Sequence, residues 1–494
     1  MHFYIVSAFI LYFIFLLIIG LIFHKKQTTS SDFIMGNRSL NFWLVALSAH
    51  ASDMSAWLFM AFPGALFLLG AQRIWIALGL LIGMFLNWQF VAPKLRSMTE
   101  KYNCYTLSSF FDKRFNDTSG TIRILSAFVM VIFLTHYLSA GLTAMGYLLE
   151  SLFGINYMIG LSIAMLVVVI YTFVGGFTTV AWTDLFQGIF LFVMILIVPA
   201  IAYTKVGGWT AIEQAAQQKN ISLSLFGNDF ESYLTIFSIA LSWGLGYFGM
   251  PHIITKFMGI KNPNELNKSK WIGMSWQLIA LGGAALIGLI SIAYFKNGIE
   301  NSEMVFIEMV KDLFHPFFAG LILCAVIAAN MSTMDSQILV CGSIVSEDLY
   351  KYFHRTEPSD KKVLWVSKIS VVLISLLALL LAFKKSSTIA STVLYSWSGL
   401  GSAFGPLVLT SLYSRKANKY GAFAGIIVGA LVVMIWPTIN PYITNFEVPP
   451  MIPGFAMSLF SIYAVSYATA NKYESNIDID NPLPEQQEHH GMRS

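Results

Sequence analysis

A single carboxylate inside an apolar stretch is the first residue here that could do chemistry. Asp53 stands in the segment 48–57 (SAHASDMSAW), about 12 residues into an apolar run that extends from 41 to 70. At 1.5 Å per residue this places it roughly 18 Å deep, near the centre of a bilayer core about 30 Å thick. An ionised group at that depth needs a cation, hydrogen-bond donors or water, and it therefore marks a functional site.

A second stretch predicts a broken helix. Segment 242–251 (SWGLGYFGMP) holds three glycines and a proline within eight residues, a composition that weakens a helix severely. Inside a membrane such a break is tolerated only where it lines a cavity. Two interrupted helices five spans apart indicate a transporter built from inverted repeats, in a five-plus-five arrangement whose breaks meet at the midplane.

Two adjacent hydroxyls in a third segment could bind a cation. Ser332 and Thr333 lie mid-span in 328–335 (AANMSTMD). Sodium takes oxygen ligands, and unwound backbone carbonyls with two hydroxyls would form a small oxygen cage. Taken alone, a Ser or Thr in a membrane helix usually bonds back to the carbonyl of its own preceding turn. The histidines His50 and His136 are expected to pack or hydrogen-bond, because neither has a second metal ligand at helical spacing.

The composition requires a lipid environment for these segments. Of 494 residues, 56% are hydrophobic and 11% are charged, with a mean hydropathy of +0.67. A soluble protein carries about 25% charged residues, so this chain cannot cover a water-exposed surface. No basic segment suggests nucleic-acid binding, and the three scattered cysteines suggest neither a metal site nor a disulfide framework.

The sequence therefore predicts an all-α integral membrane protein. The first apolar segment, at 3–23, is expected to be a membrane helix and not a signal peptide, because it lacks a basic N-terminal region and a cleavage site. A transmembrane domain is expected over 1–472, followed by a polar, disordered tail at 473–494 in the cytoplasm. About 13 transmembrane helices are predicted, at 3–23, 41–70, 74–93, 124–153, 156–175, 184–204, 232–256, 271–295, 314–345, 364–383, 388–413, 420–437 and 450–470.

The basic residues orient this arrangement. With the N-terminus outside, 23 of the 30 Lys and Arg fall on the cytoplasmic side. Cytoplasmic loops are enriched in these residues, so the count predicts an external N-terminus, a cytoplasmic C-terminus and residence in the cell membrane.

Several motifs, in order along the chain, resemble those of the sodium:solute symporter family, and within it the sodium/proline symporters. The resemblance extends from the GNRSL segment at 36–40 to the SAFGP segment at 402–406. Its most specific parts are ASDMS at 51–55, GGF at 175–177 with WTD at 182–184, WGLGYFG at 243–249 with Pro251, MST at 331–333 and SEDLYK at 346–351.

The resemblance implies a leucine-transporter-like core of 13 helices and a set of site residues. Sodium, the co-transported ion, would meet backbone oxygens of Ala51, Met54 and Ala329 and the hydroxyls of Ser332 and Thr333. The matching carboxylate for sodium coupling is Asp53. Arg38 and Asp184 match positions important on the cytoplasmic side. The positions that match a proline site are Ser55, Tyr137, Trp243, Tyr247 and Pro251.

Three departures from the proline pattern keep other solutes open. Ala56 and Ala61 stand where glycines are usual, and Met250 stands where a glutamine commonly precedes the proline. A sodium symporter for another amino acid, a carboxylate or a sugar is the nearest alternative. A sensor would need a signalling domain, an enzyme would need a convergent acid–base or metal cluster, and a channel would need a polar face through the whole membrane. The sequence predicts none of these features. No obligate protein partner is expected.

Overall fold

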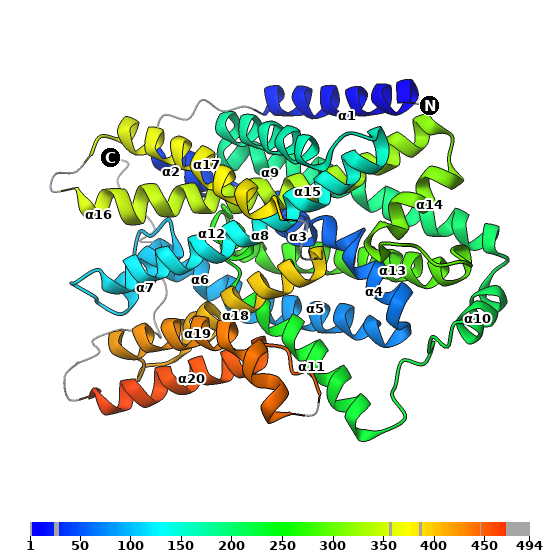
Figure 1. The fold of residues 1–494 in the computed structure, drawn as a ribbon. Helices are drawn as coiled ribbons and strands as arrows, with labels where there is room; N and C mark the ends of the chain where they lie inside the picture. The colour runs from blue at the N-terminus through cyan, green and yellow to red at the C-terminus, as the bar shows by residue number, and fades with distance from the viewer. Residues whose placement is uncertain (1, 24–28, 355–357, 385–387, 445, 471–494) are drawn as a thin grey trace, which may run out of the picture.

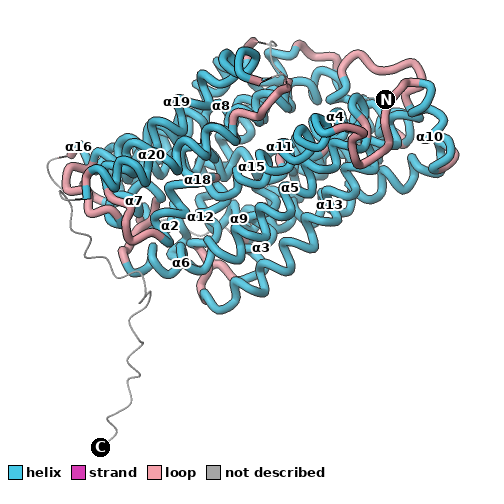
Figure 2. The backbone as a smooth tube through the Cα atoms, turned by 90° about the horizontal axis from the view of Figure 1, so that it is seen from below, coloured by secondary structure: helices cyan, strands magenta, loops and turns pink. Residues whose placement is uncertain are grey.

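The computed structural model describes residues 2–23, 29–354, 358–384, 388–444 and 446–470. All regular elements in these residues are helical, apart from one isolated parallel bridge between Leu40 and Ile260. The long helices run side by side across the view of Figure 1, and the view turned by 90° in Figure 2 shows the same alignment. The expected tail at 473–494 lies outside the described residues.

Most of the long helices match the predicted spans. In the part of the chain that the structure describes, nine helices are long and apolar enough to cross a membrane, or up to 11 if each of two bent pairs is one span. The nine contain α1 (His2–Ile22), α5 (Ile74–Leu86) with the short elements on either side of it, α8 (Thr121–Phe153), α9 (Tyr157–Val206), α13 (Leu266–Tyr294), α15 (Pro316–Ser343), α17 (Asp360–Ala382), α19 (Lys419–Ile443) and α20 (Met451–Ala468). A further long helix, α18 (Ile389–Tyr413), is not among the nine.

Helix α9 combines two predicted spans. Its 50 residues would be about 75 Å long if straight, more than twice the thickness of a bilayer core. Gly176 interrupts it with φ 66°, a left-handed value that glycine adopts without strain. Two spans within α9, together with α18, would bring the number to 13, which stays a prediction.

Shorter elements connect the long ones. Two of them extend neighbouring helices through π-helical turns: η4 (Asn87–Val91) with α6 (Ala92–Lys101) follows α5, and η8 (Ile344–Tyr350) with α16 (Lys351–Phe353) follows α15. The other connecting elements are α2 (Ser30–Met35), η1 (Gly36–Arg38), η3 (Ala71–Arg73), α7 (Leu107–Arg114), α10 (Trp209–Gln218), η6 (Pro263–Glu265), η7 (Ser302–Met304) and α14 (Val305–Leu313).

The first of the two predicted breaks lies in the Asp53 segment. Helix α3 (Phe42–Met54) ends one residue after Asp53, and the chain continues through η2 (Ala56–Leu58) into α4 (Ala61–Leu69) at an angle of 65°. Ser55 between them has φ 46°, which is rare outside glycine and breaks the helix. Helix α3 lies at the centre of the bundle, packed against α9, α12, α13 and α15.

The second broken helix is also confirmed. Helix α11 (Phe230–Gly246) passes through η5 (Tyr247–Gly249) into α12 (Pro251–Met258), with a bend of 49°. Met250 at the break is extended (φ −86°, ψ 102°), and Pro251 opens α12, where its missing N–H leaves no bond unmade. A Cβ at Gly249 would lie 2.5 Å from the Leu400 carbonyl oxygen, so this glycine lets η5 and α18 approach closely.

Candidate functional site

The residues expected to bind sodium meet where α15 crosses the break of α3. The Ser332 hydroxyl donates to the carbonyl of Ala51 at 2.9 Å and to that of Ala329 at 3.0 Å. The Thr333 hydroxyl donates to Ala329 at 3.1 Å and accepts the N–H of Ser55 at 3.0 Å. Both hydroxyls therefore bond back to their own helix, as expected for isolated hydroxyls. Ser332 also bonds to α3, and Thr333 bonds to Ser55 at the break that follows α3.

Met54 is placed beside this group by the helix break itself. It is buried and is the last residue of α3, next to Ser55, whose N–H is held by α15. The five predicted sodium ligands therefore lie in one region, four of them connected by hydrogen bonds. Within the described residues, His, Cys, Asp and Glu side chains form no group of three that could hold a metal ion. The hydrogen bonds in this region bring carbonyl and hydroxyl oxygens together.

Asp53 reaches the second broken helix directly. The Tyr247 hydroxyl donates to the Asp53 carboxylate, and both residues are buried. Gln277 of α13 donates its side-chain N–H to the same hydroxyl at 2.9 Å, and Asn87 of η4 donates to the Tyr247 carbonyl at 3.1 Å. Sequence reasoning missed Gln277 and Asn87, because a single amide in an apolar helix carries no motif.

Three of the expected solute residues line two small cavities beside the breaks. Tyr137 of α8 borders both: the Ser55 cavity, with Ser55, Ala56 and Thr333, and the Asp53 cavity, with Asp53, Trp57, Trp243 and Trp397. Each has a volume of about 10 Å³, which is about the minimum that holds one water molecule. In this conformation the Ser55 and Asp53 cavities, here called the midplane cavities, are smaller than any solute.

Aromatic rings form one wall of the Asp53 cavity. Trp243 lies between Trp57, at a ring-centroid distance of 4.9 Å, and Trp397 of α18, at 5.8 Å. Trp397 also stands edge-on to the Tyr247 ring at 5.1 Å, and its indole N–H donates to the Trp243 carbonyl at 3.2 Å. Trp57 is the last residue of the segment 48–57, which the sequence had marked as functional. Trp397 was not predicted, because nothing in its local sequence distinguishes it.

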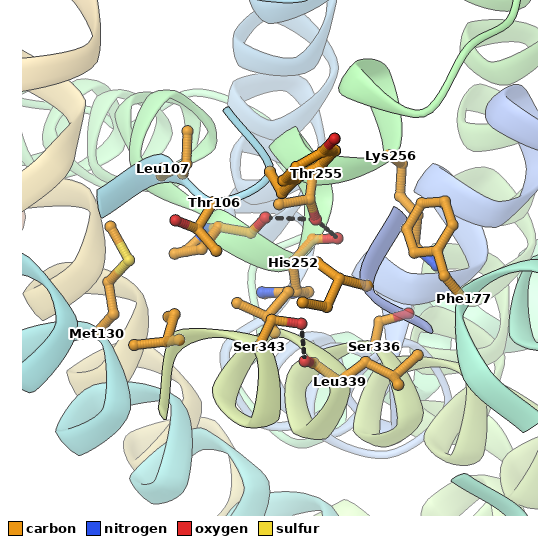
Figure 3. Close-up of a pocket in the computed structure, with 15 residues that line it drawn as sticks. Thr106, Leu107, Met130, Phe177, His252, Thr255, Lys256, Ser336, Leu339 and Ser343 are labelled. Carbon is orange, nitrogen blue, oxygen red and sulfur yellow. Dashed lines mark hydrogen bonds between the residues drawn. The ribbon is translucent and has the colours of Figure 1, made fainter. Parts of the chain in front are cut away.

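Pro251 is separated from Trp243. On a regular helix Trp243, Tyr247 and Pro251 would share one face, but the extended backbone at Met250 ends that register. Pro251 instead lines a third cavity, the inner cavity, together with His252, Thr255 and Lys256 of α12 and residues of α15 (Figure 3).

Asp184 is the centre of a buried charged group. Its carboxylate accepts hydrogen bonds from Ser48 at 2.6 Å and Ser52 at 3.3 Å, both on α3. Lys256 of α12 completes the group with its ammonium 3.0 Å from Asp184. The Lys256 and Asp184 side chains are 2% and 0% exposed, so their charges compensate each other away from water. Lys256 was not predicted, because nothing in the sequence indicates that it meets Asp184.

Arg38 lies apart from these groups, in the connection before α3. Its guanidinium donates to the carbonyls of Thr99 at 2.9 Å and Cys104 at 3.0 Å, which ties η1 to the end of α6. Burial, and then the neighbouring positive Arg96, lower the pKa of Arg38 from its usual value.

Comparisons with known proteins agree with this geometry. The model of the sodium:solute symporter family matches residues 33–429. The osmoregulated proline transporter OpuE of Bacillus subtilis (strain 168) is 43% identical over 93% of this chain and 94% of its own length. The high-affinity proline transporter PutP of the same organism is 42% identical, over 92% and 96%, and the sodium/proline symporter of Escherichia coli (strain K12) is 39% identical, over 93% and 92%.

Solved structures give the same fold at low sequence identity. A Na⁺-coupled sialic acid symporter in a substrate-bound outward-open state matches with a TM-score of 0.78 at 18% identity, covering 96% of this chain and 98% of that one. MhsT in complex with L-phenylalanine matches with a TM-score of 0.52 at 13% identity, covering 86% and 98%. These likenesses confirm the expected leucine-transporter-like fold.

Proposed function

Because the chain belongs to the sodium:solute symporter family, we propose that it couples the inward movement of sodium to the uptake of L-proline across the cell membrane. The observation that carries the proposal is the contact of three elements at one point. The hydroxyls of α15 bond to the last turn of α3 and to Ser55 at its break. Asp53, two residues before Ser55, bonds to Tyr247 at the break between α11 and α12. Relatives that are named as proline transporters support proline as the solute.

Sodium binds, in this proposal, between α3 and α15. The carbonyls of Ala51, Met54 and Ala329 and the hydroxyls of Ser332 and Thr333 supply the oxygens. In the present structure the Ser332 and Thr333 protons point at carbonyl oxygens. An arriving sodium ion would take those lone pairs, and the hydroxyl protons would turn away from it.

Coupling follows from what the ion holds together. A sodium ion shared by α3 and α15 favours the conformation in which both halves of the cage are in place, and it shifts the population towards that state. Asp53 lies beside the cage and binds Tyr247, so the same shift positions the second broken helix. Sodium thereby prepares the solute site before proline arrives.

Proline suits the groups around the Asp53 cavity. The N–H groups freed at a broken helix favour a carboxylate. The faces of Trp243 and Tyr247 favour the secondary ammonium group and can pack against the ring. Widening the cavity is necessary, because its present volume is about 10 Å³.

One sodium ion is sufficient energetically. Each imported charge contributes about 2.3 kcal/mol per 100 mV, and a tenfold sodium gradient adds about 1.4 kcal/mol. At a membrane potential of about 100 mV, the two contributions together sustain a solute gradient of roughly 500-fold.

A second candidate is a sodium symporter for another solute. Ala56, one of the departures from the proline pattern, lines the Ser55 cavity, so a solute bound there would contact it. The proposal assigns 1–472 to a single transmembrane domain with its N-terminus outside and its C-terminus inside the cell. It requires sodium, solute and a lipid bilayer, and it assigns no catalytic step.

Uptake of labelled proline into proteoliposomes tests the proposal. Uptake should need an inward sodium gradient, and unlabelled proline should compete while sugars and dicarboxylates should not. Asp53→Asn should insert normally and lose sodium-driven uptake. If proline fails to compete with a solute that the protein does transport with sodium, the other-solute candidate replaces proline. If no solute shows sodium dependence, the symport proposal is wrong.

A further inference from the structure

The inner cavity is a third space in the bundle, lined mainly by apolar side chains and containing the polar residues His252, Thr255 and Lys256. Its lining side chains come from α12 and α15 and from segments that the basic residues place on the cytoplasmic side, including Ile34 of α2 and Tyr105–Thr106 before α7 (Figure 3). Its volume of about 20 Å³ holds one water molecule in the present conformation.

His252 of α12 has no polar partner in this cavity. The side chain is fully buried, and neither ring nitrogen has a hydrogen bond to any described residue. A neutral imidazole carries one donor and one acceptor, and buried groups of this kind are almost always paired. Two unpaired nitrogens at the wall of a cavity indicate that their partner is a molecule that enters it.

The same histidine contacts a residue that lines both midplane cavities. The Tyr137 ring stands edge-on to the His252 ring, with centroids 5.8 Å apart and planes at 89°. Tyr137 lines both the Ser55 and the Asp53 cavities, and Pro251 lies next to His252 in the chain. The Tyr137–His252 ring pair therefore links the midplane cavities to the inner cavity by direct contact.

The charges around the inner cavity favour a solute without net charge. Lys256 lines it, but the Lys256 ammonium is bound to Asp184 at 3.0 Å. The hydroxyls of Thr255 and Ser336 are engaged too, with the Pro251 carbonyl at 2.9 Å and with Ser52 at 2.8 Å. The His252 ring adds one donor and one acceptor that no described residue engages, beside a dipole from the ion pair.

We propose that the inner cavity is a second binding site for the transported zwitterion, which occupies it after leaving the midplane and hydrogen-bonds there to the His252 ring. The inference rests on the proposed function. Rotation of the Tyr137 and His252 rings away from each other would open the path, and movement of α12 against α15 would widen the cavity to the size of the solute.

Transport measured separately from each side tests this site. Half-saturation for proline would be determined by uptake from the outer side and by efflux from the cytoplasmic side, at equal sodium and zero potential, in oriented vesicles. His252→Phe keeps a ring and removes both polar atoms. We expect its inner half-saturation constant to rise about tenfold, with the outer constant within twofold of wild type. A substitution cannot alter the overall equilibrium, so the maximal efflux rate should rise by a similar factor.

Controls separate this role from a structural one. His252→Gln, which keeps a donor and an acceptor, should restore much of the inner affinity. His136→Phe, at a histidine of α8 that contacts Tyr395, should change neither side. If His252→Phe does not insert, His252→Leu provides the same test, because it also removes both polar atoms.

Two results would overturn the inference: equal shifts on both sides, or no shift on either side. The failure of the proposed function looks different, because the wild-type protein would then show no sodium-dependent proline transport from either side.

Discussion

The hydrogen-bonded chain from Gln277 through Tyr247 to Asp53 allows a quantitative prediction. A phenol has one proton to donate. Because Gln277 donates to the Tyr247 oxygen at 2.9 Å, the Tyr247 proton is directed to Asp53. Asn87 holds the backbone of the same tyrosine. Hydrogen bonds thus hold both the backbone carbonyl and the side-chain hydroxyl of Tyr247. Gln277 should therefore affect the sodium site only through the Tyr247 hydroxyl.

The expected magnitudes follow from the groups involved. A hydrogen bond to a charged group contributes about 1.5–3 kcal/mol, whereas one between neutral groups contributes about 0.5–1.5 kcal/mol. Tyr247→Phe should therefore raise the sodium concentration for half-maximal uptake by a factor of roughly 10–150. Gln277→Leu should raise it by roughly 2–10-fold. With both substitutions the effect should equal that of Tyr247→Phe alone.

Sodium titrations of proline uptake in proteoliposomes measure the three variants, with the membrane potential held constant and choline replacing sodium. Tyr157→Phe is the matched control, because the Tyr157 hydroxyl donates to Ala382 at 3.1 Å, outside the group that includes Asp53. Effects of Gln277→Leu and Tyr247→Phe that add to within about 0.3–0.5 kcal/mol would show independent roles. That result would refute the relay.

Four further predictions concern the rest of the site. Ser332→Ala and Thr333→Ala should each raise the half-maximal sodium concentration far more than they lower the thermal stability in detergent, and unchanged titrations would leave these hydroxyls only a structural role. Lys256→Met should cost about 3–5 kcal/mol of stability by stranding Asp184, and adding Asp184→Asn should recover most of it; an unaltered melting temperature would contradict this. Trp243→Ala should weaken proline uptake while sodium binding stays measurable. Proline should outcompete glycine by about thirtyfold, since its three ring methylenes contribute about 2 kcal/mol, and equal competition would argue against an aromatic ring site.

The features that sequence reasoning located share one property: their physical cost is local. A carboxylate such as Asp53 in a long apolar run is costly wherever the helix packs. Glycines and a proline around Tyr247 weaken a helix before any tertiary contact forms. The two breaks and the membrane class could therefore be predicted from residue types and spacing alone. The individual ligand roles came from the family resemblance and stay proposals.

What only the tertiary structure decided is which side chains from other helices complete the site. Gln277, Trp397 and Lys256 are ordinary residues in their own segments, and each became part of the site because its helix packs one particular face against a broken helix. The separation of Pro251 from Trp243 has the same origin. Helical spacing predicted a shared face, but the extended backbone at Met250 turned α12 towards the inner cavity. Side-chain partners across helices depend on rotation and crossing angle, which packing sets and local sequence does not.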